Sequence, residues 1–246
     1  MIIKCLLSAP ILFAFTSVNA MQYQVVEMQQ QRFDVIQVQQ LNQLELFLKN
    51  PQTNQYYQKF SHIEKQLPAC AQLKFAMNAG MYHADFQAVG LYVEKGKQKT
   101  KLNEATGEGN FFMQPNGVLA WNTQHAVVQN TAEYKQHGFK ALYATQSGPM
   151  LLYKNQINPR FLPNSTSLKI RNAVGIKEQK LYFVMSQQPV SFYQLAQFFK
   201  EKLNISDALY LDGSISSLYV AESNRNDHYF KLGPIVAVVD RTRCTN

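Results

Sequence analysis

The chain has 246 residues, a length that fits one large domain able to bury a substantial core without structural metals or many disulfides. Lysine and arginine number 24 against 16 aspartates and glutamates, so the formal net charge is +8. The basic residues are dispersed and accompany no recognised nucleic-acid-binding motif, and we therefore expect no nucleic-acid partner.

Residues 1–20 have the pattern of a secretory signal peptide. Lys4 supplies a positively charged start, residues 6–15 are apolar, and Val18-Asn19-Ala20 is a small-residue cleavage site. We expect cleavage near Ala20, a mature chain over residues 21–246 that forms one domain, and a periplasmic or secreted location. No later run approaches the roughly 20 apolar residues needed to cross a bilayer, so no membrane span is expected.

Hydrophobic periodicity and turn residues give more strand signals than helix signals along the chain. The expected elements are, in chain order, a hairpin over residues 23–38, helices over 41–50 and 55–66, a strand over 73–77, hairpins over 89–102 and from 117 onward, a helix over 131–137, strands over 141–145 and 150–153, a long surface loop over 155–169, a hairpin over 171–185, a helix over 191–203, and strands over 208–211 and 235–239. Hairpins dominate, so we predict an α+β fold with a mixed β-sheet core built largely from hairpins and flanked by helices.

The most informative stretch follows the apolar run at residues 208–211. The run ends on Asp212 and Gly213, and three hydroxyls follow at Ser214, Ser216 and Ser217. A carboxylate at the end of a buried strand, beside a flexible glycine, is a common position for a reactive group in enzymes. An ordinary Asp-Gly turn between two strands is the alternative interpretation.

A second dense set of polar groups follows the strand predicted at 73–77. Asn78, Gly80, His83 and Asp85 fall within eight residues at the strand end, which is typical of a ligand-binding segment. Asp85 could complete a carboxylate pair with Asp212. His83 by itself would equally suit a surface histidine or one hydrogen-bonded within the fold.

Two further segments carry groups suited to an anion or a sugar. Ser147 and Gly148 precede a proline between apolar runs, where exposed backbone amides can hold an anion or a hydroxyl, although a plain turn explains the pattern too. Arg171 starts a glycine-containing strand and offers a planar fork for phosphate or carboxylate. Residues 103–118 predict a shaped, glycine-containing loop followed by a hairpin.

Two cysteines remain after removal of the signal, Cys70 and Cys244. In an oxidising compartment this pair could form a disulfide that ties the C-terminal tail to the segment after the second expected helix. Two separate thiols are the alternative.

Several familiar kinds of chemistry have no support in the sequence. There is no phosphate-binding Walker loop and no dinucleotide fingerprint, and the scattered histidines lack zinc-ligand spacing, so no cofactor and no metal are expected. The serines after Gly213 do not form the Gly-x-Ser-x-Gly elbow. Acyl hydrolysis by one of these serines stays open as a minor alternative.

Taken together, these motifs resemble those of the phosphodiester glycosidase family, in particular its small exported bacterial branch. The resemblance covers about residues 75–240. It is carried by Asn78-Ala79-Gly80-Met81-Tyr82, Gly109-Asn110-Phe111-Phe112 with Pro115-Asn116-Gly117, Ser147-Gly148-Pro149, Arg171-Asn172-Ala173-Val174-Gly175, and Leu211-Asp212-Gly213-Ser214-Ile215-Ser216-Ser217. In one respect the chain departs from the family pattern Asp-Gly-Gly-Gly-Ser-Ser, because Ser214 and Ile215 replace two glycines, which implies a tighter loop.

The resemblance implies hydrolysis between a sugar C1 and a phosphate oxygen, with a carbohydrate or glycosyl phosphate as substrate. It gives Asp212 the role of nucleophile or general base, Arg171 that of a phosphate clamp, and Asp85 or His83 that of an assisting acid or base. The residues expected to line the substrate are Arg171, Asn78, Gly80, Asn110, Asn116, Ser147, Gly148, Gly213, Ser214 and Ser216. The alternative is an envelope polysaccharide- or peptidoglycan-binding protein that keeps the fold without catalysis.

Overall fold

The computed structural model describes residues 19–212 and 215–244. Most of the expected signal peptide, and the candidate site residues Gly213 and Ser214, lie outside the described residues. In the described part, no helix combines the length and the apolar character needed to cross a membrane.

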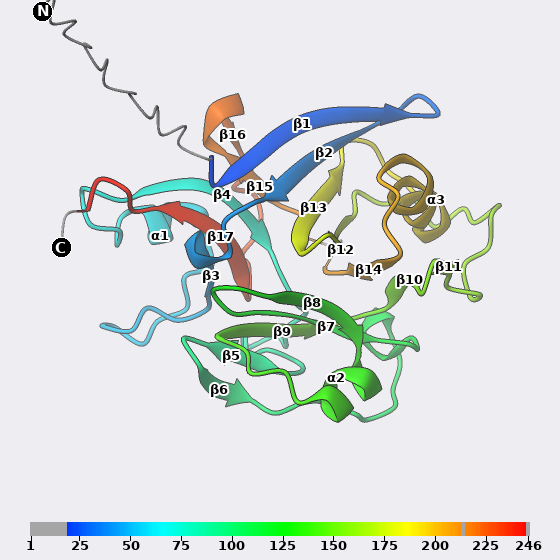
Figure 1. Cartoon of the computed structure of the whole chain (residues 1–246), viewed down its shortest axis with the longest axis horizontal. Coiled ribbons are helices and arrows are strands. Elements are labelled where there is room, and N and C mark those ends of the chain that lie inside the picture. Colours follow the sequence, from blue (N-terminus) through cyan, green and yellow to red (C-terminus); the bar gives the residue numbers. More distant parts are fainter. Residues whose placement is uncertain (1–18, 213–214, 245–246) are drawn as a thin grey trace, which may run out of the picture.

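The described strands form three sheets (Figure 1). Sheet one has the strand order β1 (Met21–Met28), β2 (Gln31–Val38), β13 (Lys180–Ser186), β12 (Asn172–Lys177), β14 (Asp207–Tyr210), β10 (Met150–Tyr153) and β11 (Gln156–Ile157). Sheet two has the order β16 (Arg225–Asn226), β15 (Leu218–Val220), β4 (Gln72–Asn78), β17 (Ile235–Asp240) and β3 (Leu44–Phe47). Sheet three has the order β6 (Lys97–Thr100), β5 (Tyr92–Glu94), β9 (Tyr143–Ser147), β7 (Gly117–Trp121) and β8 (Ala126–Asn130).

The pairings between these described strands are all antiparallel. The hairpin-built sheet core agrees with the sequence prediction. The sheets are antiparallel rather than mixed in direction, however, and the fold holds more strand and less helix than an α+β description implies. Six of the pairings join strands that follow one another in the chain, such as β1–β2 and β12–β13, and a short turn between two such strands makes them run in opposite directions.

The first hairpin shows how turn chemistry fixes the register. β1 and β2 pair over their full lengths, from Met21 opposite Val38 to Met28 opposite Gln31. The two turn residues, Gln29 and Gln30, both have positive φ angles of 51° and 65°. This is the conformation that matches the right-handed twist of the flanking strands, and the predicted hairpin is confirmed.

The helix predicted over residues 41–50 is wrong. Leu41–Gln43 forms a single 3₁₀ turn, and the next four residues are strand β3. All four β3 residues are buried, and they pair with β17. The leucine spacing at 41, 44 and 48 suits a helix, but burial in a sheet overrides such a weak local preference. The second expected helix shortens to α1 (Phe60–Glu64).

The other two helices lie where the sequence places them. In α2 (Thr131–His137) the Asn130 side chain accepts a hydrogen bond from the Glu133 amide, and the helix ends at Gly138 with a φ of 61°. α3 (Phe192–Gln197) starts at a capping box formed by Ser191 and continues as a π-helical turn over Phe198–Lys202. α3 and this turn pack on one face of sheet one.

The three sheets share one hydrophobic core. Its members include Ile36 of sheet one, Phe75 of sheet two and Trp121 of sheet three, each 0% exposed. The Trp121 indole N–H also donates to the Leu44 carbonyl at 3.0 Å, which joins sheet three to sheet two. Strand ends from all three sheets can therefore meet at one place.

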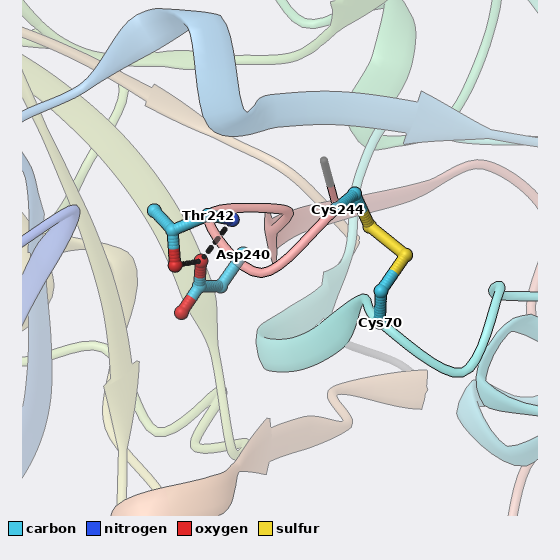
Figure 2. Close-up of a disulfide and its surroundings, with 4 residues drawn as sticks. All are labelled: Cys70, Asp240, Thr242 and Cys244. Carbon is cyan, nitrogen blue, oxygen red and sulfur yellow. Dashed lines mark hydrogen bonds between the residues drawn. A yellow bond between two sulfur atoms is a disulfide. The ribbon is translucent and has the colours of Figure 1, made fainter. Parts of the chain in front are cut away.

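The disulfide between Cys70 and Cys244 is formed (Figure 2). It joins the segment just before β4 to the tail that follows β17, and 174 positions separate the two cysteines. Next to it, the Asp240 carboxylate accepts hydrogen bonds from the Thr242 amide and hydroxyl at 2.9 and 2.7 Å. These contacts fasten the C-terminal tail to sheet two.

Candidate active site

Two buried asparagines hold the backbone of Asp212. The Asn78 side-chain amide donates to the Asp212 carbonyl at 2.5 Å, and the Asp212 N–H donates to the Asn172 side-chain oxygen at 3.1 Å. The Asn172 amide donates in turn to the Asn78 carbonyl at 2.9 Å. Asn78 ends β4 and Asn172 begins β12, so sheets one and two both hold Asp212, the second residue after β14.

Two serines complete this arrangement. The Ser217 N–H donates to the Asn78 side-chain oxygen at 2.9 Å, and the Ser147 hydroxyl, at the end of β9, donates to the Leu211 carbonyl at 2.7 Å. One carboxamide thus bonds both Asp212 and Ser217, which brings the two ends of the 212–217 loop close together. Sheet three contributes through Ser147, so the loop is anchored where the three sheets meet.

Ile215 adds an apolar anchor to the same loop. Its half-buried side chain packs against the cluster that includes Phe60 and Ile235. The isoleucine, at a position where the resemblance implies a glycine, therefore ties the loop to the region around α1 and β17. An anchored loop loses conformational freedom that glycines would retain.

Tyr82 lies within electrostatic reach of Asp212. Burial and the negative charge of Asp212 raise the pKa of the Tyr82 phenol to about 12. Its hydroxyl donates to the Lys231 carbonyl at 2.7 Å, and its ring stacks on Phe86 with centroids 5.4 Å apart. The phenol therefore lies near enough to Asp212 to be affected by its charge, and it is protonated at neutral pH as an ordinary tyrosine is.

Arg171 is placed differently from its expected role. Its guanidinium donates to the Val190 carbonyl at 2.9 Å, the Ser167 carbonyl at 2.9 Å and the Tyr210 hydroxyl at 3.4 Å, and it lies 3.8 Å from the Phe192 ring centroid. The residue is 1% exposed. A guanidinium engaged in this way holds α3 against sheet one and is not presented to a phosphate arriving from solvent.

The alternation of side chains along β12 explains this placement. Arg171 and Ala173 face the cluster beneath α3, whereas Val174 faces the shared core. Asn172 therefore lies on the opposite face from Arg171, where it meets Asn78 and Asp212. The motif at 171–175 does reach the site, but through its asparagine.

His83 and Asp85 lie in an exposed turn after β4. The Asp85 carboxylate accepts hydrogen bonds from the Gln87 backbone and side-chain amides at 3.0 and 2.9 Å, while the His83 amide donates to the Gln87 carbonyl. The described contacts of Asp85 stabilise this turn and do not bring it together with Asp212. Of residues 78–85, Asn78 contacts Asp212 through a hydrogen bond, and Tyr82 lies near enough for the charge of Asp212 to raise its pKa.

Gly80 and Gly148 are required by close packing. A Cβ on Gly80 would lie 2.3 Å from the Thr145 hydroxyl oxygen, and one on Gly148 would lie 2.6 Å from the Phe111 carbonyl oxygen and 2.8 Å from Asn116 Cβ. Both contacts are too short for any other residue, so these glycines let neighbouring segments approach β9 and the 110–116 loop.

Asn110 and Asn116 lie beside Gly148 in that loop. The Asn116 side chain donates to the Phe111 carbonyl at 3.1 Å and accepts from the Thr131 hydroxyl at 2.7 Å. Asn110 is half-buried, and its carbonyl would lie 3.2 Å from a Cβ on Gly148. This group connects to Asp212 indirectly, through the adjacent Ser147.

A pocket of about 450 Å³ opens beside the 212–217 loop. Ser216 and Ser217 form part of its wall, and the Ser216 hydroxyl donates to the Ile170 carbonyl at 3.2 Å. Other lining residues are Lys169, Gln187, Arg225, Asp227, Tyr229 and Phe230.

A charged network lies at this pocket. Asp34 is 0% exposed and accepts hydrogen bonds from the Tyr23 hydroxyl at 2.8 Å and the Gln187 amide at 2.9 Å, and it pairs with Arg225. Arg225 also pairs with Asp227 at 2.9 Å. Asp227 accepts the Leu218 N–H at 3.0 Å, so the network supports the start of β15 directly after the loop.

Sequence reasoning missed Asn172, Tyr82, Arg225 and Asp227. A carboxylate inside the apolar run around Asp34 was an available signal, because a buried charge in a strand needs a partner elsewhere in the chain. Among the described residues, no three histidine, cysteine, aspartate or glutamate side chains gather closely enough to hold a metal ion.

The family model for phosphodiester glycosidases matches residues 71–238, more than half of the chain. The chain belongs to the phosphodiester glycosidase family. This agrees with the range of about 75–240 over which the motifs resemble the family, and it places the anchored Asp212 loop inside the family domain.

Two similar proteins extend the comparison. The chain is 39% identical over 189 residues to the uncharacterized protein YigE of Escherichia coli (strain K12), an alignment that covers 72% of this chain and 74% of that protein. It also resembles the solved catalytic domain of zebrafish N-acetylglucosamine-1-phosphodiester alpha-N-acetylglucosaminidase, auto-inhibited by its pro-peptide. That match has a TM-score of 0.62 and 12% identity, and it covers 91% of this chain and 84% of the zebrafish chain. At this identity the likeness shows a shared fold.

Proposed function

We propose that the protein is a hydrolase that cleaves the glycosidic bond of a sugar phosphodiester or of a phosphate-bearing envelope glycan. The observation that carries the proposal is Asp212, whose backbone is held on both sides by Asn78 and Asn172 in a chain of the phosphodiester glycosidase family. A residue whose backbone is fixed by buried amides can present its side chain from a defined position, which is what catalysis requires.

The chemistry follows from the leaving group. When the bond between C1 and the phosphate oxygen breaks, the electron pair stays on the phosphate, which is a good leaving group without prior protonation. The demanding step is to stabilise the positive charge that develops at C1 and to deliver a nucleophile. Asp212 serves either as that nucleophile or as the base that takes a proton from the attacking water, and water supplies the new oxygen on C1.

Because the phosphate leaves without prior protonation, the reaction depends little on an assisting acid. His83 and Asp85 lie in an exposed turn, and this proposal gives them no step in the reaction. Asn78, Asn172 and Ser147 act as positioning residues, because their described side-chain hydrogen bonds go to the backbone of the loop and its flanks.

We also propose that the protein acts outside the cytoplasm. Support comes from the signal-like pattern of residues 1–20 and from the Cys70–Cys244 disulfide, since disulfides persist in oxidising compartments. Fractionation of cells that produce the full chain tests this, because export predicts a shorter mature form beginning near Met21.

A non-catalytic glycan-binding role is the second candidate, and the observation that favours it is Ile215. The isoleucine replaces a family glycine and fixes the loop to an apolar cluster. The two candidates are distinguished by incubating the purified mature protein with a panel of glycosyl phosphodiesters and phosphate-bearing envelope glycans. Release of free sugar together with a phosphomonoester supports the enzyme, whereas binding without release supports the alternative.

A further inference from the structure

We propose that the pocket beside the 212–217 loop binds the sugar ring of the substrate, with Tyr229 and Phe230 as its stacking platform. The inference rests on the proposed function for the identity of the substrate. Beyond that function, it assigns the sugar ring of the substrate to this pocket and names Tyr229 and Phe230 as the residues that recognise the ring.

The aromatic rim is the first observation. Tyr229 is 84% exposed and Phe230 is 46% exposed, and both line the pocket. Large exposed aromatic side chains next to each other at a pocket mouth are typical of ligand-binding surfaces, because leaving them in water is unfavourable. The apolar C–H face of a sugar ring is a suitable partner for such a surface.

The orientation of the Tyr229 ring is set in advance. It stacks on His228 with ring centroids 4.7 Å apart and an interplanar angle of 23°. A nitrogen of the His228 ring lies 3.2 Å from the Asn226 carbonyl oxygen, next to the short strand β16. One face of the tyrosine is therefore supported while most of its surface stays open, so binding loses little side-chain entropy.

The polar groups of the pocket suit hydroxyls better than a phosphate. Arg225 is paired with both Asp34 and Asp227, so its charge is already balanced by carboxylates. Paired charges give directional hydrogen bonds with little net field, and Asp227 and Gln187 add further polar atoms to the lining. Lys169 is the remaining lysine or arginine of the lining, and it is exposed at the surface.

Position and size complete the argument. Ser217 in the pocket wall and the Asp212 backbone bond the same Asn78 carboxamide, so the pocket begins within one side chain of the Asp212 backbone. Its volume of about 450 Å³ is in the range of small-molecule sites, which measure about 300–1,000 Å³. A single sugar ring fits this space with its C1 directed toward the loop.

The test uses the Asp212→Asn protein, in which binding can be measured without turnover. Calorimetry with N-acetylglucosamine, glucose and inorganic phosphate is carried out on this protein and on versions that also carry Tyr229→Ala or Phe230→Ala. Each ring removal should weaken binding of the preferred sugar about tenfold. Leu162→Ala, which removes another exposed apolar side chain at 63% exposure outside this pocket, should leave the affinity within about twofold.

Three results would overturn the inference: no binding of either sugar, sugar affinity unchanged by loss of the rings, or displacement of the sugar by phosphate at the same site. The inference and the proposed function fail in different ways. If Asp212→Asn abolishes hydrolysis but ring removal changes neither sugar affinity nor KM, the pocket assignment is wrong and the proposed enzymatic function is supported. If ring removal weakens sugar binding but no glycosyl phosphodiester is hydrolysed, the sugar-binding pocket is supported and the proposed hydrolase function is wrong.

Discussion

Replacement of Asn78 by alanine is the sharpest perturbation of the loop architecture. The side chain is 1% exposed, and its carboxamide makes two hydrogen bonds, one to the Asp212 carbonyl and one from the Ser217 amide. Asn78→Ala removes both, so the half-buried Asp212 carbonyl and the buried Ser217 N–H each lose this partner.

The magnitude follows from those two groups. Each buried polar group left unsatisfied costs about 1–3 kcal/mol, and since Asn172 still holds Asp212 we expect a loss of about 3 kcal/mol in the free energy of unfolding. For a chain of this size each kcal/mol lowers Tm by about 2–4 °C, so the expected decrease is about 6–12 °C. The substitution also removes the side chain that links the two ends of the 212–217 loop, so Asp212 is positioned less precisely. We therefore expect kcat to fall about 10- to 100-fold in the protein that remains folded.

The assay combines urea denaturation with steady-state hydrolysis of a glycosyl phosphodiester at a temperature where each variant is folded. Asn158→Ala is the matched control, because Asn158 is 5% exposed and its amide donates to the Met150 carbonyl at 3.1 Å in a different loop. It should lower stability comparably and leave kcat near the wild-type value.

Equal kcat values for Asn78→Ala and Asn158→Ala would refute the reasoning. In that case Asn78 would contribute to folding alone, and the position of Asp212 would be set by other contacts.

Three further predictions concern the surroundings of the loop. Arg225→Met should lower the free energy of unfolding by about 3–5 kcal/mol because Asp34 is left as a buried, uncompensated charge, and adding Asp34→Asn should recover part of that loss in urea titrations. Cys70→Ser should cost about 2–4 kcal/mol in the same assay by releasing the C-terminal tail, and unchanged stability would show that the tail is held without the disulfide. The pKa of Tyr82, about 12, should decrease in Asp212→Asn and stay above the ordinary value near 10 because burial remains, as followed by NMR of ring-labelled tyrosine; an unchanged pKa would place the carboxylate away from the phenol.

The same tyrosine gives a stability effect at high pH. Because the folded-state pKa is raised, the unfolded chain loses the phenol proton first, so the contribution of Tyr82 is complete below pH 10 and is lost as the pH rises toward 12. Tyr57 and Tyr219 have pKa values raised to about 12 in the same direction, chiefly by burial.

Turn and capping residues in the sequence correctly predicted the hairpins and helix ends that depend on neighbouring residues alone. The hairpin of β1 and β2, the cap of α2 at Asn130 and its end at Gly138 all follow from turn and capping residues. The helix expected over residues 41–50 failed because pairing of β3 with β17, nearly two hundred residues apart, decides that segment. No local pattern contains that information.

In the candidate site, too, some residues follow from local sequence signals and others depend on how distant strands pair. The polar strand ends at Asn78, Ser147 and Asp212 were predicted, and hydrogen bonds bring them together. The sequence pattern favours Arg171 over its neighbour Asn172, because a guanidinium is the stronger candidate for a phosphate ligand. Which of two adjacent strand residues faces the site depends on the register of β12 between β13 and β14, and this is set by the assembled sheet.

The most direct test of the central claim is the rate of glycosyl phosphodiester hydrolysis by wild type, Asp212→Asn and Asp207→Asn. Asp207 lies at the opposite end of β14, where its carboxylate accepts from the Lys154 amide at 2.9 Å, so it controls for loss of an aspartate on the same strand. We predict that Asp212→Asn lowers kcat about 100-fold or more with folding intact, while Asp207→Asn stays near wild type. Equal rates in wild type and Asp212→Asn, or no hydrolysis by wild type across the panel, would contradict the account.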